Sequence, residues 1–120
     1  MTLEQLLEQL KSQQKLNFAE VIATLEAHYE YTPQSFTNGL GVDCVQNPAG
    51  TNEGSCKVFA FGQLQQLSPE QTLACFGEHY RKVLAIPEGT DHRNIRSFMH
   101  HGWAGIEFLG NEPALKLKYQ

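Results

Sequence analysis

The loop at residues 50–57 is the first stretch whose residue types could do chemistry. It reads Gly-Thr-Asn-Glu-Gly-Ser-Cys-Lys and leads into an apolar run. A phosphate-binding loop follows the pattern Gly-x-x-x-x-Gly-Lys-Ser/Thr, so the lysine is displaced here and Glu53 puts a negative charge where a phosphate would lie. We therefore expect no nucleotide site. Free N–H groups at a helix beginning near Ser55, together with Lys57 and Arg96, could instead hold a small anion. The alternative is that this loop only meets the conformational demands of a tight turn.

Residues 91–103 are the second candidate. Several hydrogen-bond donors lie on the exposed side of one predicted helix, namely His92, Arg93, Asn94 and Arg96. Trp103 follows directly, and a rigid aromatic side chain beside arginine is typical of an interface anchor or of a pocket that binds anions. The alternative places Trp103 in the core and pairs Arg96 with Glu53 or Glu107.

The leading hypothesis joins the two stretches into one binding surface of a non-catalytic protein. Its predicted residues are Asn52, Glu53, Lys57, His92, Arg96 and Trp103. The alternative is an enzyme or binder for a small anionic or acyl ligand, with Cys56 as nucleophile near a helix N-terminus and His92 as base. That reaction needs both side chains at one open cleft, so a buried Cys56 would exclude it. We expect no catalytic residue in the leading hypothesis.

Histidines raise the question of a metal. Neighbouring side chains such as those of His100 and His101 diverge on a helix, and the sequence lacks the spacings typical of metal sites. We therefore predict neither a metal nor another cofactor.

Composition indicates one domain over residues 1–120. The chain has a mass of 13.5 kDa with 41% hydrophobic and 18% charged residues, which is typical of a folded globular domain. A net charge of -4 argues against nucleic acid and against an anionic membrane as partners. No apolar run reaches the ~20 residues that span a bilayer. An unidentified protein or a small anion is the expected partner, and the chain is expected to be a monomer or a weak homodimer.

Start and stop signals predict five helices. They begin at Thr2, Asn17, Ser55, Ser68 and Asp91. Lys57–Phe61 would also fit a short strand, so the third helix has an alternative. The fourth helix is expected to continue to Pro87 and the fifth to stop at Gly102.

Strands are expected in two places. Residues 35–46 contain a tight turn between short strands, which predicts a central hairpin region. Ala104–Leu109 and Leu115–Tyr119 flank a turn and predict a C-terminal hairpin. Because helices dominate and the strands cluster, the predicted class is α+β, a single small domain that is mostly helical with short antiparallel strands.

An ordered series of motifs resembles the HopJ family, small proteins named as type III secretion effectors of plant-associated bacteria. The motifs are Phe36-Thr37-Asn38-Gly39, the 47–57 loop, Leu73–Gly77, Tyr80-Arg81, and Asp91–Met99 with Gly102-Trp103. The resemblance covers nearly the whole chain and implies a bacterial protein with type III secretion, but it supplies no catalytic residue or reaction. The first residues predict a regular helix rather than the flexible Ser-rich segment of an export signal. We therefore expect a cytoplasmic protein, with effector activity inside a host as a further alternative.

Overall fold

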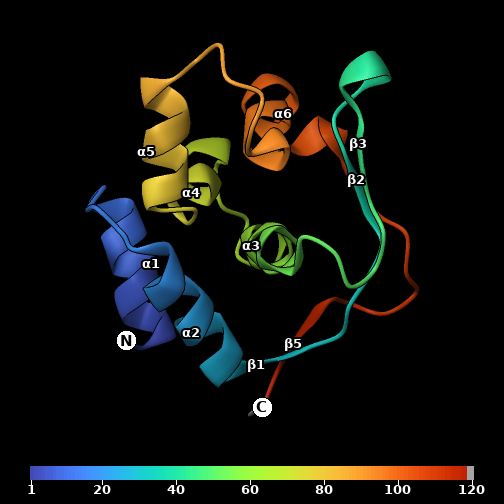
Figure 1. Ribbon diagram of the computed structural model, residues 1–120. Coiled ribbons are helices and arrows are strands. Elements are labelled where there is room, and N and C mark those ends of the chain that lie inside the picture. Colours follow the sequence, from blue (N-terminus) through green and yellow to red (C-terminus); the bar gives the residue numbers. More distant parts are fainter. Residues whose placement is uncertain (119–120) are drawn as a thin grey trace.

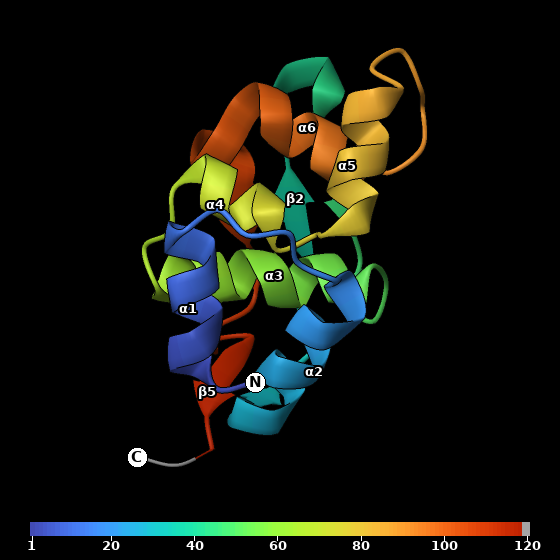
Figure 2. The same ribbon diagram turned by 90° about the vertical axis from the view of Figure 1, so that its left-hand side faces the viewer.

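Helix α3 (Glu53–Leu64) runs through the middle of the molecule, and the other elements pack around it (Figures 1 and 2). The computed structural model describes residues 1–118. Buried positions lie all round the middle of α3, which explains why its sequence lacks a clear amphipathic pattern. They are Cys56, Val58, Phe59, Ala60, Phe61 and Gly62. A Cβ at Gly62 would lie 2.7 Å from the Trp103 ring, so only glycine fits there.

The first two helices form where their caps predict them. In α1 (Leu3–Lys11), Thr2 and Gln5 make the expected reciprocal capping box. In α2 (Phe18–His28), the Asn17 side chain accepts a hydrogen bond from the Glu20 N–H at 3.3 Å.

The segment predicted as one helix after Ser68 is in fact two. Helix α4 (Pro69–Ala74) begins with the expected Ser68 cap, but α5 (Glu78–Ala85) begins again after a break at Gly77. Gly77 has a φ of +58°, and an added Cβ would lie 2.6 Å from the Phe18 backbone nitrogen. The linker between α1 and α2 therefore passes too close to this point for any side chain.

The strands form two small antiparallel sheets. One contains β2 (Phe36–Asn38), β3 (Val45–Asn47) and β4 (Ile106–Phe108) in the order β3-β2-β4, and it confirms the predicted central hairpin. A 3₁₀ turn, η1 (Gly41–Asp43), joins β2 to β3.

The predicted C-terminal hairpin is wrong in its pairing. β4 pairs with β2, whereas β5 (Leu115–Leu117) pairs with β1 (Tyr29–Tyr31). Buried aromatic packing favours this arrangement, because Phe108 stacks on Phe36 with ring centroids 5.4 Å apart. The predicted end of the last strand at Tyr119 lies outside the described residues.

The last helix, α6 (Arg93–His101), begins after His92 rather than after Asp91. The Asp91 carboxylate does not cap it, because that group accepts a hydrogen bond from Arg96 Nη2 at 2.7 Å. The helix ends at Gly102 as predicted, and the short 3₁₀ helix η2 (Gly102–Gly105) leads to β4.

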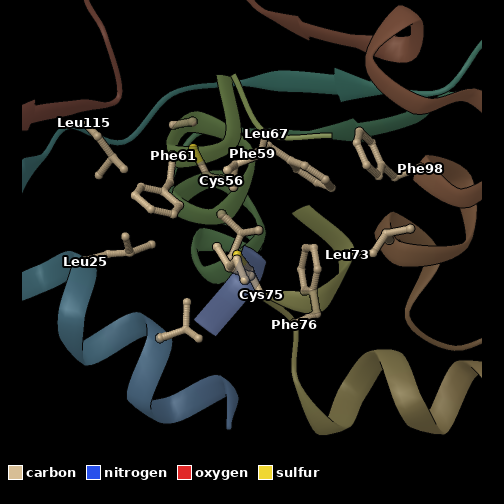
Figure 3. Packing of buried hydrophobic residues seen from close by; sticks show 14 of the residues in the cluster. Leu25, Cys56, Phe59, Phe61, Leu67, Leu73, Cys75, Phe76, Phe98 and Leu115 are labelled. Carbon is tan, nitrogen blue, oxygen red and sulfur yellow. The ribbon is translucent and has the colours of Figure 1, made fainter. Parts of the chain in front are cut away.

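An aromatic cluster connects α3 to the helices and strands around it; Figure 3 labels three of its members, Phe59, Phe76 and Phe98. Phe59 is fully buried at its centre, with the rings of Phe36, Phe76, Phe98 and Trp103 at centroid distances of 5.0–6.4 Å. With its helices and two small antiparallel sheets, the single domain confirms the predicted α+β class.

Candidate functional site

A pocket of about 540 Å³ lies where the N-termini of α3 and α6 meet, and we call it the α3–α6 pocket. Its polar lining residues are Gln46, Asn52, Ser55, His79, His92, Arg93 and Asn94. Phe18, Val45, Phe76 and Ile95 supply apolar wall, and Gly54 lies at the helix start. The volume is in the range typical of small-molecule sites.

Both helices begin at this pocket without a side-chain cap. Asn52 and His92 are the residues before α3 and α6, and each has a left-handed backbone with φ of 49°. A capping residue is usually extended, with its side chain accepting from the first turn. No side chain of the described residues caps either helix. The first-turn N–H groups and the positive ends of two helix dipoles are therefore available to a ligand.

A network of three buried asparagines and the exposed Asn52 holds the two helix starts together. Asn94 Nδ2 donates to Asn47 Oδ1 at 2.8 Å, and Asn52 Nδ2 donates to the same oxygen at 2.7 Å. Asn38 and Asn47 in turn donate to Asn94 Oδ1, at 3.0 and 3.1 Å. Asn52 thus uses its side chain to bind β3 instead of capping α3. The network fixes the spacing of the two N-termini and leaves their N–H groups free.

The charges around the pocket are mixed. Arg93 is exposed and is the one arginine or lysine among the lining residues of the described chain. The rings of His79 and His92 lie 5.1 Å apart at 39°.

Two carboxylates, those of Asp91 and Glu78, lie beside residues that line the α3–α6 pocket. Asp91 Oδ2 is 4.0 Å from His92 Nε2, and the hydrogen bond from Arg96 lowers the pKa of Asp91, which keeps it charged. Glu78 accepts from the Phe18 N–H at 2.8 Å, which lowers the pKa of Glu78. Both carboxylates are thus already engaged by other groups.

The predicted surface is brought together only in part. Asn52 and His92 line the same pocket, but Lys57 lies elsewhere, 3.5 Å from Glu26 and 4.6 Å from the centre of the Tyr31 ring. Glu53 is not among the residues that line the pocket. Lys57 and Glu53 therefore do not face the ligand space that Asn52 and His92 share.

Arg96 and Trp103 have structural contacts. Arg96 donates to the backbone oxygens of Asp91, Ile86 and Pro87 at 2.6, 3.0 and 3.2 Å, so it holds the loop before α6. Trp103 packs against the core and its indole N–H donates to the Leu67 carbonyl at 2.9 Å. Arg96 does not pair with Glu53 or Glu107, the alternative partners that the sequence left open.

Cys56 and His92 do not form a nucleophile–base pair in this geometry. Cys56 is fully buried, and its Sγ lies 3.9 Å from the Gln34 carbonyl oxygen. Burial raises the pKa of its thiol, which disfavours the thiolate that a nucleophile needs. His92 lines the α3–α6 pocket, whereas Cys56 does not.

Other kinds of site are not seen in residues 1–118. These residues contain no group of three or more His, Cys, Asp or Glu side chains that could hold a metal ion. None of their helices has the length and apolar character needed to cross a membrane.

Sequence reasoning missed His79 and most of the asparagine network. His79 comes from α5 and reaches the pocket through contacts with Phe18 and His92. These contacts join residues far apart in the chain, so no local pattern indicates them. The sequence names Arg93 among the donors of this segment but predicts Arg96 as the binding residue, whereas Arg93 lines the pocket and the loop before α6 engages Arg96.

Comparison with known proteins gives the family. A family model described as the HopJ type III effector protein matches residues 3–113. This chain belongs to the HopJ family. Among solved structures, the HopJ chain is similar to a crystal structure of the unknown function protein VPA0580, with a TM-score of 0.89 and 49% sequence identity. The match covers 98% of this chain and 95% of that chain. A search of curated proteins found no match.

Proposed function

We propose that this HopJ-family chain is a non-catalytic binding protein whose α3–α6 pocket holds a small anion, such as a phosphate or carboxylate group. The observation that carries the proposal is the convergence of two uncapped helix starts on one pocket. Such N–H groups with a helix dipole behind them bind anions well.

The side chains around the helix starts support the same chemistry. Arg93 can pair with two oxygens of a phosphate or carboxylate at once. His79 and His92 add donors, and the rings of Phe18 and Phe76 give the pocket an apolar wall for the rest of a ligand. An organic anion would therefore fit better than a bare ion.

The asparagine network pre-organises the site for binding. Its members come from β2, β3, the loop before α3, and α6, and they fix the two helix starts before any ligand arrives. A pre-organised site loses less entropy on binding. The buried Cys56 leaves the enzyme alternative without its proposed nucleophile.

Calorimetric titration with inorganic phosphate, sulfate and acetate tests the proposal. Binding by the native chain should weaken at least about tenfold in Arg93→Ala, which removes one charge-assisted contact of about 1.5 kcal/mol or more. Lys116→Ala is the matched control, because Lys116 is an exposed cation on β5 and does not line the pocket. Equal losses in both variants, or no binding of any anion by the native chain, would remove the proposal and direct attention to a protein partner.

A cytoplasmic location, a monomeric or weakly dimeric state and activity as a secreted effector stay predictions. The family description supports type III secretion, and a fusion of residues 1–30 to a reporter enzyme measures it. Export that depends on the secretion apparatus would favour an effector, whereas retention of the reporter would favour a role inside the bacterium.

A further inference from the structure

We propose that a second pocket, at the C-terminal end of α3, binds a small and mainly apolar molecule that carries a hydrogen-bond donor. This Gln34 pocket has a volume of about 350 Å³ and shares no lining residue with the α3–α6 pocket. Its walls come from the second half of α3 and from the chain that joins β4 to β5, the red segment below and to the right of α3 in Figure 1. The proposal does not depend on the anion site.

The walls of the Gln34 pocket are largely apolar. The apolar residues that line it are Ala60, Leu64, Phe108, Pro113, Ala114 and Leu115. Ala60, Ala114 and Leu115 are buried and belong to the core, so the floor of the pocket is rigid. Leu64 is 51% exposed, and a bound apolar molecule would cover it. Removing this exposed apolar surface from water favours binding.

A buried amide in the wall of the pocket calls for a ligand that carries a hydrogen-bond donor. Gln34 lines the pocket and is only 6% exposed, yet its Oε1 has no hydrogen-bond partner among the described residues. Buried carbonyl oxygens rarely lack a hydrogen-bond partner, because burial removes their hydrogen bond to water and an unreplaced bond costs free energy. An N–H or O–H group of a ligand would supply the missing donor.

Gly110 allows the amide to lie at this position. A Cβ at Gly110 would lie 2.7 Å from Gln34 Oε1, so a side chain there would displace the amide. The terminal torsion of glutamine is soft, so a small rotation can present the oxygen to a donor in the pocket.

The charge of the pocket limits the ligand further. Glu112 is the one charged residue among the lining residues, all of which lie in the described part of the chain. A carboxylate at the rim repels anions and tolerates neutral or cationic molecules. The Gln34 pocket and the α3–α6 pocket therefore have opposite preferences for charge.

Indole and benzofuran are matched probes for this site. They have nearly the same shape, but only indole carries an N–H donor. In a ¹⁵N amide titration, indole should shift the signals of Gly110, Ala114 and Leu115 and bind about tenfold more tightly than benzofuran. Equal affinity of the two probes, or no shift of these signals by indole, would overturn the proposal.

Two variants separate the polar and the apolar contributions. Gln34→Met keeps the length of the side chain and removes the unpaired oxygen, so the folded state should persist and the preference for indole should vanish. Leu64→Asn changes a half-exposed wall residue with little risk to the fold, and it should weaken both probes by a similar factor. A Gln34→Met protein that still prefers indole tenfold would contradict the assignment. If Gln34→Met fails to fold, Leu64→Asn still tests the location, because unchanged affinity in that variant would also contradict it.

Discussion

Replacing Asn47 by alanine is expected to destabilise the fold by about 3 kcal/mol. In the native protein the Asn47 side chain accepts hydrogen bonds from Asn94 and Asn52 and donates to Asn94 and to Val45. Asn94 is 7% exposed, so its Nδ2 group would lose its acceptor in a place that water hardly reaches. An unsatisfied buried donor costs about 1–3 kcal/mol, and the lost hydrogen bonds and the small cavity add about 1 kcal/mol more. Asn52 is exposed and can turn to water at little cost.

Urea unfolding followed by the fluorescence of Trp103, the single tryptophan, measures this change. For a domain of this size, a loss of 3 kcal/mol corresponds to a melting temperature lower by about 12 °C. Asn111→Ala is the control, because Asn111 is exposed and its change should stay within about 0.5 kcal/mol. A loss below about 1 kcal/mol in Asn47→Ala would show that the asparagine network does not hold the helix starts as we describe.

Three further changes test other contacts. Gly77→Ala should lower the free energy of unfolding by about 2 kcal/mol or more in the same assay, because the left-handed φ of +58° and the Phe18 backbone nitrogen at 2.6 Å leave no room for a Cβ. A loss of stability smaller than that at an exposed helix position would refute this. The folded-state pKa of Glu78 is lowered, so its stabilising effect is present above the unfolded pKa of about 4.3 and is lost as the pH falls through the folded value. Glu78→Gln should therefore flatten the acid side of the curve of stability against pH. An unchanged curve would contradict the contact with Phe18. Arg96→Ala should speed amide exchange in residues 86–91 while anion affinity changes little, whereas a large loss of affinity would return Arg96 to the binding site.

Local signals predicted the helix starts that depend on local contacts alone. The Thr2–Gln5 and Ser68–Gln71 capping boxes join residues three apart, so the sequence contains all of their information. Asp91 has a good capping residue type, but Arg96 takes its carboxylate, and the helix begins one residue later. The prediction that Ser55 begins the third helix is also wrong, because α3 begins at Glu53 and Ser55 lies inside it.

Contacts between distant segments account for the remaining differences. The sequence places strands near 106 and 115, but only the packed core decides that they pair with β2 and β1 instead of with each other. The break at Gly77 depends on the linker between α1 and α2, which no pattern around residue 77 reveals.

For the candidate site, the sequence predicts which segments meet but not which of their side chains face the pocket. The sequence predicts that the 50–57 loop and the 91–103 segment adjoin, and Asn52 and His92 do line one pocket. Which side chains face the pocket depends on the rotation of each helix in the fold. Lys57 and Arg96 point to partners elsewhere for that reason, whereas Arg93 and His79 line the pocket.

An amide-resolved NMR titration of the native chain with inorganic phosphate tests the central claim most directly. The account predicts that the largest shifts fall on the first-turn amides of the two helices, Gly54 and Ser55 in α3 and Asn94 and Ile95 in α6. These shifts should be lost in Arg93→Ala and kept in Lys116→Ala. Shifts that centre on Lys57 or Arg96 instead, or shifts that survive in Arg93→Ala, would contradict an anion site between the two helix starts.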